Sequence, residues 1–129
     1  MSGRRTVLYI DDDPVNVRLV ELILQGRPAL RVISAALGAE GLDLARTQRP
    51  ALLLLDLRLP DMSGEEVLHA VLADPILRPT PVVILTAAAE PESIERLLAI
   101  GARAYVTKPV DIFQFLAVVD DCLGDEPTD

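Results

Sequence analysis

The chain has 129 residues, a length that suits one domain with a single hydrophobic core. Its formal net charge of -8 argues against a nucleic-acid interface, which would need a basic stripe, and its single cysteine rules out an internal disulfide bond. Three aspartates at positions 11–13 interrupt the first apolar run, and no run approaches the roughly 20 residues that span a bilayer, so we expect a cytoplasmic protein.

Four short apolar runs, and a fifth that is weaker, have the composition of buried strands. They are rich in Val, Ile and Leu and are bounded by polar residues, proline or glycine, as parallel strands covered on both faces are. We predict strands at 7–10, 30–34, 52–55, 82–85 and 104–106, of which the second is the weaker one.

Each of these runs is followed by a segment with helical periodicity. The first helix is predicted to begin at Pro14, because proline suits a first turn, and to end near Gly26. The other helices are predicted at 39–48, 65–73, 91–100 and 112–123, and Asp111 is expected to cap the last. This alternation indicates a parallel sheet with helices on both faces.

The five strand and helix pairs predict an α/β fold, a single doubly wound flavodoxin-like domain. Right-handed crossovers and the strong apolarity of the first, third and fourth strands put those strands in the centre, which gives the order 2-1-3-4-5. We expect the domain to occupy residues 6–123, with an N-terminal extension at 1–5 and a short acidic tail at 124–129.

Chemically useful side chains follow four of the predicted strands. Asp11 and Asp12 follow the first strand, Asp56 the third and Thr86 the fourth, and Lys108 comes shortly after the fifth. Ligands bind beyond the carboxyl ends of the strands in such a sheet, where the strand order reverses. We therefore expect these side chains to converge at one edge of the sheet.

The residue types at this edge are those that phosphate chemistry uses. Crowded carboxylates repel one another, and a divalent cation with hard oxygen ligands, such as Mg²⁺, would relieve the repulsion. Asp56 stands alone at its strand end and is the candidate nucleophile, which would form an aspartyl-phosphate. Lys108, the only lysine of the chain, and Thr86 would contact the phosphoryl oxygens.

Four motifs occur in an order and spacing that match a known family. They are Ile10-Asp11-Asp12, Leu55 to Gly64, Leu85-Thr86-Ala87 and Tyr105 to Pro109. With these motifs the chain resembles, from Thr6 to Leu123, the response regulator receiver domain of two-component signalling, the family to which the chemotaxis regulators belong.

The resemblance implies a phosphoacceptor and a metal site. Asp56 would accept the phosphoryl group and would bind Mg²⁺ together with Asp12. Asp11 would act on the metal through a water molecule, and the backbone carbonyl of Arg58 would complete the protein ligands.

The resemblance also implies a switch. Lys108 would contact the phosphoryl group, and Thr86 and Tyr105 would form a pair that repacks after phosphorylation. Arg58 and Ala88 occupy positions at which the family varies, so the lifetime of the phosphorylated state is left open.

The function implied by the resemblance is a phosphorylation-dependent signalling switch, not an enzyme with a separate substrate. A histidine kinase or a phosphotransfer protein would be the phosphodonor, and repacking would alter a partner-binding face on the fourth helix, fifth strand and fifth helix. No direct contact with nucleic acid or membrane is implied. The sequence leaves open the downstream protein partner, a phosphorylation-linked dimer, and whether the chain stands alone or comes from a larger protein.

Other functions fit parts of the same pattern. A phosphate-independent scaffold would keep the fold without using Asp56. A Mg²⁺-dependent phosphatase would commonly need a second acid two residues after its nucleophile, where this chain has Arg58. A nucleotide-binding domain would need a glycine-rich first turn, where this chain has Asp11 to Pro14.

Several residues near the motifs have simpler explanations. Asp13 lies directly before Pro14 and is expected to cap the first helix. His69 is expected to lie in solvent, and Cys122 to pack as a small core residue. Tyr105 fits either core packing or a mobile switch, and the switch is favoured.

Overall fold

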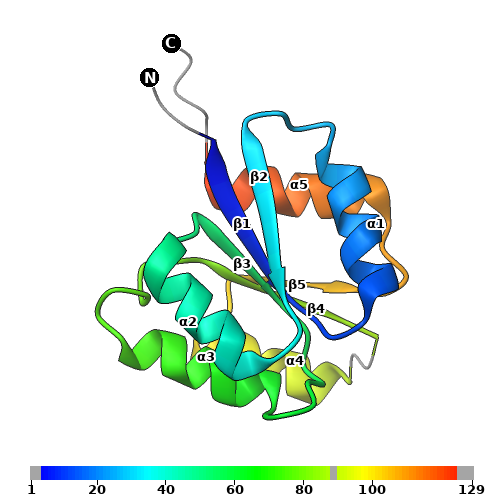
Figure 1. Cartoon of the computed structure of the whole chain (residues 1–129). Coiled ribbons are helices and arrows are strands. Elements are labelled where there is room, and N and C mark those ends of the chain that lie inside the picture. The colour runs from blue at the N-terminus through cyan, green and yellow to red at the C-terminus, as the bar shows by residue number, and fades with distance from the viewer. Residues whose placement is uncertain (1–3, 88–89, 125–129) are drawn as a thin grey trace.

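The computed structural model describes residues 4–87 and 90–124, in which five strands alternate with five helices (Figure 1). Ala88 and most of the two predicted terminal segments lie outside the described residues. The strands are β1 (Arg5–Ile10), β2 (Leu30–Ala35), β3 (Leu52–Leu55), β4 (Val82–Thr86) and β5 (Ala104–Thr107). The helices are α1 (Pro14–Leu24), α2 (Gly38–Gln48), α3 (Gly64–Ala73), α4 (Pro91–Ile100) and α5 (Ile112–Leu123).

The strands form one parallel sheet in the order β2-β1-β3-β4-β5, which confirms the predicted fold class and strand order. β1 lies between β2 and β3, and the strand order therefore reverses beside it. Ile10 at the end of β1 is in register with Leu55 at the end of β3. The residues that follow these two strands consequently start side by side.

The sheet is covered on both faces, and each face has its own hydrophobic core. In Figure 1, α1 and α5 lie on one side of the sheet, and α2, α3 and α4 lie on the other. Alternate residues of β1 point to opposite cores: Leu8 and Ile10 pack toward α2 and α3, whereas Val7 and Tyr9 pack toward α1 and α5. Burial on both faces of β1, β3 and β4 explains why these three strands are continuous apolar runs, whereas β2 and β5, at the two edges of the sheet, keep exposed residues.

The strand ends extend beyond the apolar runs from which they were predicted. β1 begins at Arg5, whose backbone N–H donates to the carbonyl of Ala29 at 2.9 Å, before the first residue of the apolar run. β4 and β5 likewise continue to the polar residues Thr86 and Thr107. Backbone pairing does not depend on side-chain polarity, so hydrophobicity alone misses such residues.

Two predicted features of the helix ends are confirmed. The side chain of Asp13 accepts a hydrogen bond from the backbone N–H of Val15 at 2.9 Å, and Asp111 accepts one from Gln114 at 3.0 Å. These caps start α1 and α5. None of the helices in the described part of the chain has both the length and the apolar composition to cross a bilayer.

The start of α2 is capped from a distant loop. Its own N-cap residue, Leu37, provides no side-chain hydrogen bond. Instead, the carboxylate of Asp61 accepts the backbone N–H groups of Gly38 at 2.8 Å and Ala39 at 3.0 Å. These bonds lower the pKa of Asp61 and tie the loop after β3 to the first turn of α2.

Candidate functional site

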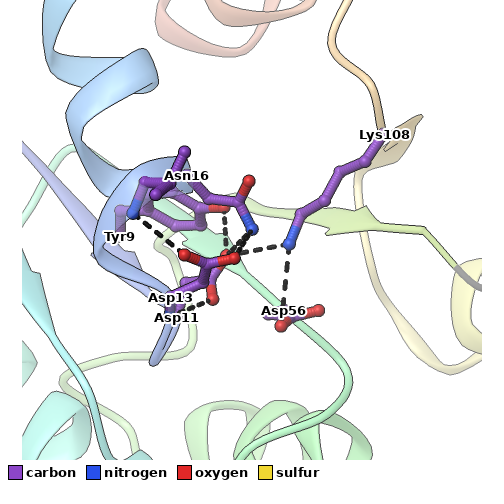
Figure 2. Close-up of polar contacts among 7 residues, drawn as sticks. Tyr9, Asp11, Asp13, Asn16, Asp56 and Lys108 are labelled. Carbon is purple, nitrogen blue, oxygen red and sulfur yellow. Dashed lines mark hydrogen bonds and ion pairs between the residues drawn. The ribbon is translucent and has the colours of Figure 1, made fainter.

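Three of the predicted site residues meet at the carboxyl edge of the sheet, as Figure 2 shows. Asp11 follows β1 and Asp56 follows β3, and the ammonium of Lys108, from the segment after β5, reaches both. Its Nζ atom lies 2.8 Å from Oδ2 of Asp11 and 3.7 Å from Oδ2 of Asp56. The strand order therefore gathers charges that are far apart in the sequence.

Asp12 completes an acidic cluster with Asp11 and Asp56. One carboxylate oxygen from each of the three lies within 4.8 Å of the others. Asp11 and Asp56 are buried, whereas Asp12 is exposed, so the cluster opens to solvent on one side. All three donors are hard oxygens, a set that suits Mg²⁺ or a similar cation. Asp13 is not part of this cluster, since its side chain caps α1.

The carboxylate of Asp11 accepts four hydrogen bonds. Oδ2 accepts from the hydroxyl of Tyr9 at 2.5 Å, from Nζ of Lys108 at 2.8 Å and from the side-chain amide of Asn16 at 3.3 Å. Oδ1 accepts from the backbone N–H of Asp13 at 2.9 Å. Burial by itself would raise the pKa of Asp11, but the hydrogen bonds from Lys108, Tyr9 and Asp13 outweigh the effect of burial and lower the pKa.

Asp56 has the opposite electrostatic balance. Burial raises its pKa above the ordinary value, and the charge of Asp11 acts in the same direction. The ammonium of Lys108 and the backbone N–H groups of Arg58 and Leu57 lower the pKa of Asp56, but their effect is smaller than that of burial and Asp11 together. The site thus holds one carboxylate whose charge is well stabilised beside one whose charge is disfavoured, and a cation would relieve the second.

The segment that carries Lys108 is fixed close to the sheet. The backbone N–H of Lys108 donates to the carbonyl of Thr86 at 3.0 Å. The peptide bond between Lys108 and Pro109 is cis. The Lys108 side chain is only 13% exposed. Its ammonium is therefore held among the acids and away from bulk water.

The two residues of the predicted switch differ in their surroundings. Thr86 ends β4 and is 1% exposed, whereas Tyr105, on β5, is 40% exposed. In the described part of the chain, the contacts of the acidic cluster do not include Tyr105. Arg58 is exposed and its backbone forms an isolated bridge with Ser63 in the loop after β3. The roles of Thr86, Tyr105 and Arg58 stay predictions.

Sequence reasoning missed two residues at this site, Tyr9 and Asn16. Tyr9 was counted as part of an apolar strand, although it lies two residues before Asp11 and therefore on the same face of β1. Asn16 lies in the first turn of α1 and donates to both Asp11 and Asp13, at 3.3 Å in each case. The sequence did offer a signal for both residues. A side chain with a polar group stands two residues before Asp11, and another stands one helical turn after the acids, and both positions can contact the carboxylates.

The simpler explanations of two other residues agree with the structure. The side chain of His69 is 58% exposed and lies 3.5 Å from Glu65, one turn away on α3. Cys122 is partly buried and packs against the core beneath α1 and α5, and this burial raises the pKa of its thiol. Neither residue contacts the acidic cluster among the described contacts.

Residues 7–120 match the family model described as the response regulator receiver domain. Among proteins of known sequence, the chain is 35% identical to the polar-differentiation response regulator DivK of Brucella anthropi over 121 residues, which cover 94% of this chain and 98% of that protein.

Solved structures share the fold over nearly the whole chain. The signal receiver domain of a LuxO repressor protein from Vibrio parahaemolyticus aligns with a TM-score of 0.87 at 29% identity, covering 93% of this chain and 90% of that one. The receiver domain of the sensor histidine kinase PA1611 from Pseudomonas aeruginosa aligns with a TM-score of 0.84 at 28% identity, covering 96% of this chain and all of that one. That structure has a magnesium ion coordinated in its active site cleft.

Proposed function

The chain belongs to the family of response regulator receiver domains, and from this premise we propose that it is a phosphorylation-controlled switch with Asp56 as the phosphoacceptor. The observation that carries the proposal is the convergence of Asp11, Asp12, Asp56 and Lys108 on one edge of the sheet. The domain is regulatory, and its chemistry is confined to gaining and losing its own phosphoryl group.

The acidic cluster fits a Mg²⁺ ion by its donor set and its charge. Asp12 and Asp56 would provide side-chain ligands, the carbonyl of Arg58 a backbone ligand, and Asp11 would act through water. The raised pKa of Asp56 supports this assignment, because a nearby cation would favour its charged form. When bound, Mg²⁺ would neutralise the carboxylates and the negative charge that develops on the phosphoryl oxygens.

In the transfer step, a carboxylate oxygen of Asp56 attacks phosphorus as the bond between phosphorus and the donor's imidazole nitrogen breaks. The electron pair of that bond returns to the imidazole, and the product is an aspartyl-phosphate. The side chain of Asp56 is 11% exposed, which leaves an approach from solvent. A histidine kinase or a phosphotransfer protein would present the donor histidine.

Lys108 would change partners during this step. Before phosphorylation its ammonium is closer to Asp11 than to Asp56. A phosphoryl group on Asp56 would carry about -1.5 to -2 units of charge, as on other phosphorylated side chains, and strong acceptor oxygens, which would draw the ammonium away from Asp11. Thr86, buried at the end of β4, would contribute its hydroxyl to the same group, and Tyr105 would repack in response.

The output surface would be the face formed by α4, β5 and α5. Large hydrophobic side chains are exposed there before phosphorylation: Tyr105 is 40% exposed on β5, and Phe113 is 85% exposed at the start of α5. These side chains supply apolar area that a partner could cover. Inward movement of Tyr105 would change this surface and so its affinity for a protein partner.

We further propose domain bounds of residues 6–123.

The direct experiment is phosphorylation by a small donor. The protein is incubated with acetyl phosphate and Mg²⁺, and its intact mass is measured beside Asp56→Asn and beside a Mg²⁺-free sample. We expect one base-labile phosphoryl adduct on the wild type and none on either control.

Each outcome decides between two functions. An adduct that needs both Asp56 and Mg²⁺ supports the switch. If neither acetyl phosphate nor a set of purified histidine kinases modifies the wild type, the phosphate-independent scaffold replaces the switch as the better explanation.

A further inference from the structure

Tyr9 combines complete burial with a polar contact to the acidic cluster. Its side chain is 0% exposed and packs in the core beneath α1 and α5, with residues that include Val20 and Phe115. Its hydroxyl nevertheless reaches the edge of the sheet and donates to Oδ2 of Asp11 at 2.5 Å (Figure 2). Tyr9 lies on β1, and Asp11 follows this strand directly with its backbone N–H still bonded to the neighbouring Ala35, so the two side chains, two residues apart, project to the same face.

Among the three side chains that donate to Asp11, Tyr9 is the one whose position the core fixes. Lys108 would be drawn to the phosphoryl group, and Asn16 divides its amide between Asp11 and Asp13. A tyrosine ring buried on all sides has few alternative rotamers, so its hydroxyl stays in place when the surface groups rearrange.

We infer that Tyr9 is a positioning residue that holds the Asp11 carboxylate in the orientation needed for Mg²⁺ binding. This inference rests on the proposed metal site. Hydrogen bonds to a metal-binding carboxylate fix its rotamer before the metal arrives, and their removal commonly lowers metal affinity by about 10-fold to 100-fold. The phenol is suited to this role because it donates a single hydrogen bond from a ring that the core holds in place.

The competing explanation is that the Asp11 carboxylate merely satisfies a polar group in the core. Tyr9→Phe separates the two explanations, because it removes the hydroxyl and keeps the ring. A purely structural hydroxyl would affect the stability of the metal-free protein and leave its affinity for Mg²⁺ unchanged. A positioning hydroxyl would affect the affinity itself.

The first measurement is Mg²⁺ titration by calorimetry of the wild type, Tyr9→Phe and Val7→Ala. Val7 is buried in the same core, on the same face of β1, and has no contact with Asp11 among the described hydrogen bonds. Val7→Ala therefore reports how much a weakened core alone changes binding. We expect the dissociation constant to rise about 10-fold in Tyr9→Phe and to stay within about twofold in Val7→Ala.

A second measurement does not require Tyr9→Phe to fold. The chain has two tyrosines and no tryptophan, so in Tyr105→Phe the emission of Tyr9 can be followed alone. A carboxylate that accepts a hydrogen bond from a phenol quenches the fluorescence of that tyrosine. If Tyr9 stays bonded to the metal-site carboxylate, its emission should change on adding Mg²⁺, with the midpoint that calorimetry gives for the same variant.

Failure of this inference is distinct from failure of the proposed function. Two results would overturn the role of Tyr9 and leave the metal site intact. One is an unchanged Mg²⁺ affinity in Tyr9→Phe. The other is Tyr9 emission that does not change on adding Mg²⁺ while calorimetry shows that Mg²⁺ binds. A wild type that binds no Mg²⁺ would overturn both.

Discussion

The ammonium of Lys108 lies 2.8 Å from the carboxylate of Asp11 and 3.7 Å from that of Asp56, so the stronger ion pair is with the acid that is not the proposed phosphoacceptor. Both side chains of the shorter pair are largely buried, at 13% exposure for Lys108 and 0% for Asp11. The lysine thus neutralises the cluster at the position where a metal would otherwise do so. Mg²⁺ and Lys108 are expected to compete for the same negative charge.

Replacing Lys108 by methionine tests this competition. Methionine keeps most of the side-chain volume and removes the charge, so Lys108→Met should bind Mg²⁺ more tightly, on the order of threefold to tenfold. The same variant should be phosphorylated more slowly, since it lacks the cation that would stabilise the phosphoryl oxygens. Calorimetry and the rate of adduct formation with acetyl phosphate measure the two effects. Lys108→Arg, which retains the charge, is the control, and weaker Mg²⁺ binding by Lys108→Met would contradict the competition.

The raised pKa of Asp56 predicts that this carboxylate destabilises the metal-free fold. A folded-state pKa above the ordinary value of 3.8 means that folding favours the protonated form, so stability falls as pH rises through this range. Asp56→Asn should therefore be more stable than the wild type at pH 7 without Mg²⁺. The difference should disappear in acid, where the wild-type carboxyl is protonated in both states.

Urea denaturation from pH 3 to pH 7 in the presence of a chelator measures this difference. Asp12→Asn, which alters the exposed acid of the same cluster, should gain less stability at pH 7 than Asp56→Asn gains. Saturating Mg²⁺ should reduce the difference in stability between Asp56→Asn and the wild type, because Mg²⁺ binding stabilises only the folded wild type. A gap that is independent of pH would show that the charge of Asp56 is not the cause.

Asp61 should stabilise the fold through α2 with the opposite pH dependence. Its pKa is lowered because its carboxylate accepts the backbone N–H groups of Ala39 and Gly38, so its contribution is present above the ordinary pKa of 3.8 and is lost as pH falls below it. In Asp61→Asn, the amide group would face one of these N–H donors without accepting from it.

Thermal unfolding of Asp61→Asn should therefore show a lower Tm than the wild type at pH 7 and a smaller difference at pH 3. Asp43→Asn is the matched control, because Asp43 is an acid within α2 itself, with a side chain that is 81% exposed and that, among the described residues, pairs with Arg46. An equal loss of Tm in both variants would contradict a specific capping role for Asp61.

Gly64, the first residue of α3, should tolerate no side chain. A Cβ atom there would lie 2.5 Å from the backbone oxygen of Asp56 and 2.7 Å from Cα of Leu57, and neither backbone atom can move freely. Gly64→Ala should cost about 1–3 kcal/mol of unfolding free energy and slow phosphorylation, because relief of the clash displaces Asp56.

Gly26→Ala is the control for that experiment. The nearest atom to a Cβ at Gly26 is the backbone oxygen of Ile23 at 3.5 Å, an ordinary contact. Its stability and its phosphorylation rate should stay close to those of the wild type. A Gly64→Ala variant with wild-type kinetics would show that the position of Asp56 does not depend on this close approach.

The sheet and the acidic cluster were predictable from the sequence because both depend on backbone topology. The apolar runs identified the strands, and the order of the strands then decided that Asp11 and Asp56 meet. The contact of Tyr9 with Asp11 was missed because an aromatic residue in an apolar run is explained by packing alone. The capping of α2 by Asp61 was missed because it joins loops that are about 22 residues apart, and no local pattern encodes such a pair.

The distance along the chain between Lys108 and Asp11, 97 residues, has a consequence for biosynthesis. A nascent polypeptide that has emerged only as far as β4 already holds Asp11, Asp12 and Asp56 but lacks the lysine that neutralises them. Contacts of such high sequence separation form only after the loop entropy of the whole domain has been lost. The three acids and the lysine therefore come together only after β5 and the segment that follows it have been synthesised and have folded. A shorter nascent chain should be a poor substrate for any phosphodonor that requires Lys108 beside Asp56.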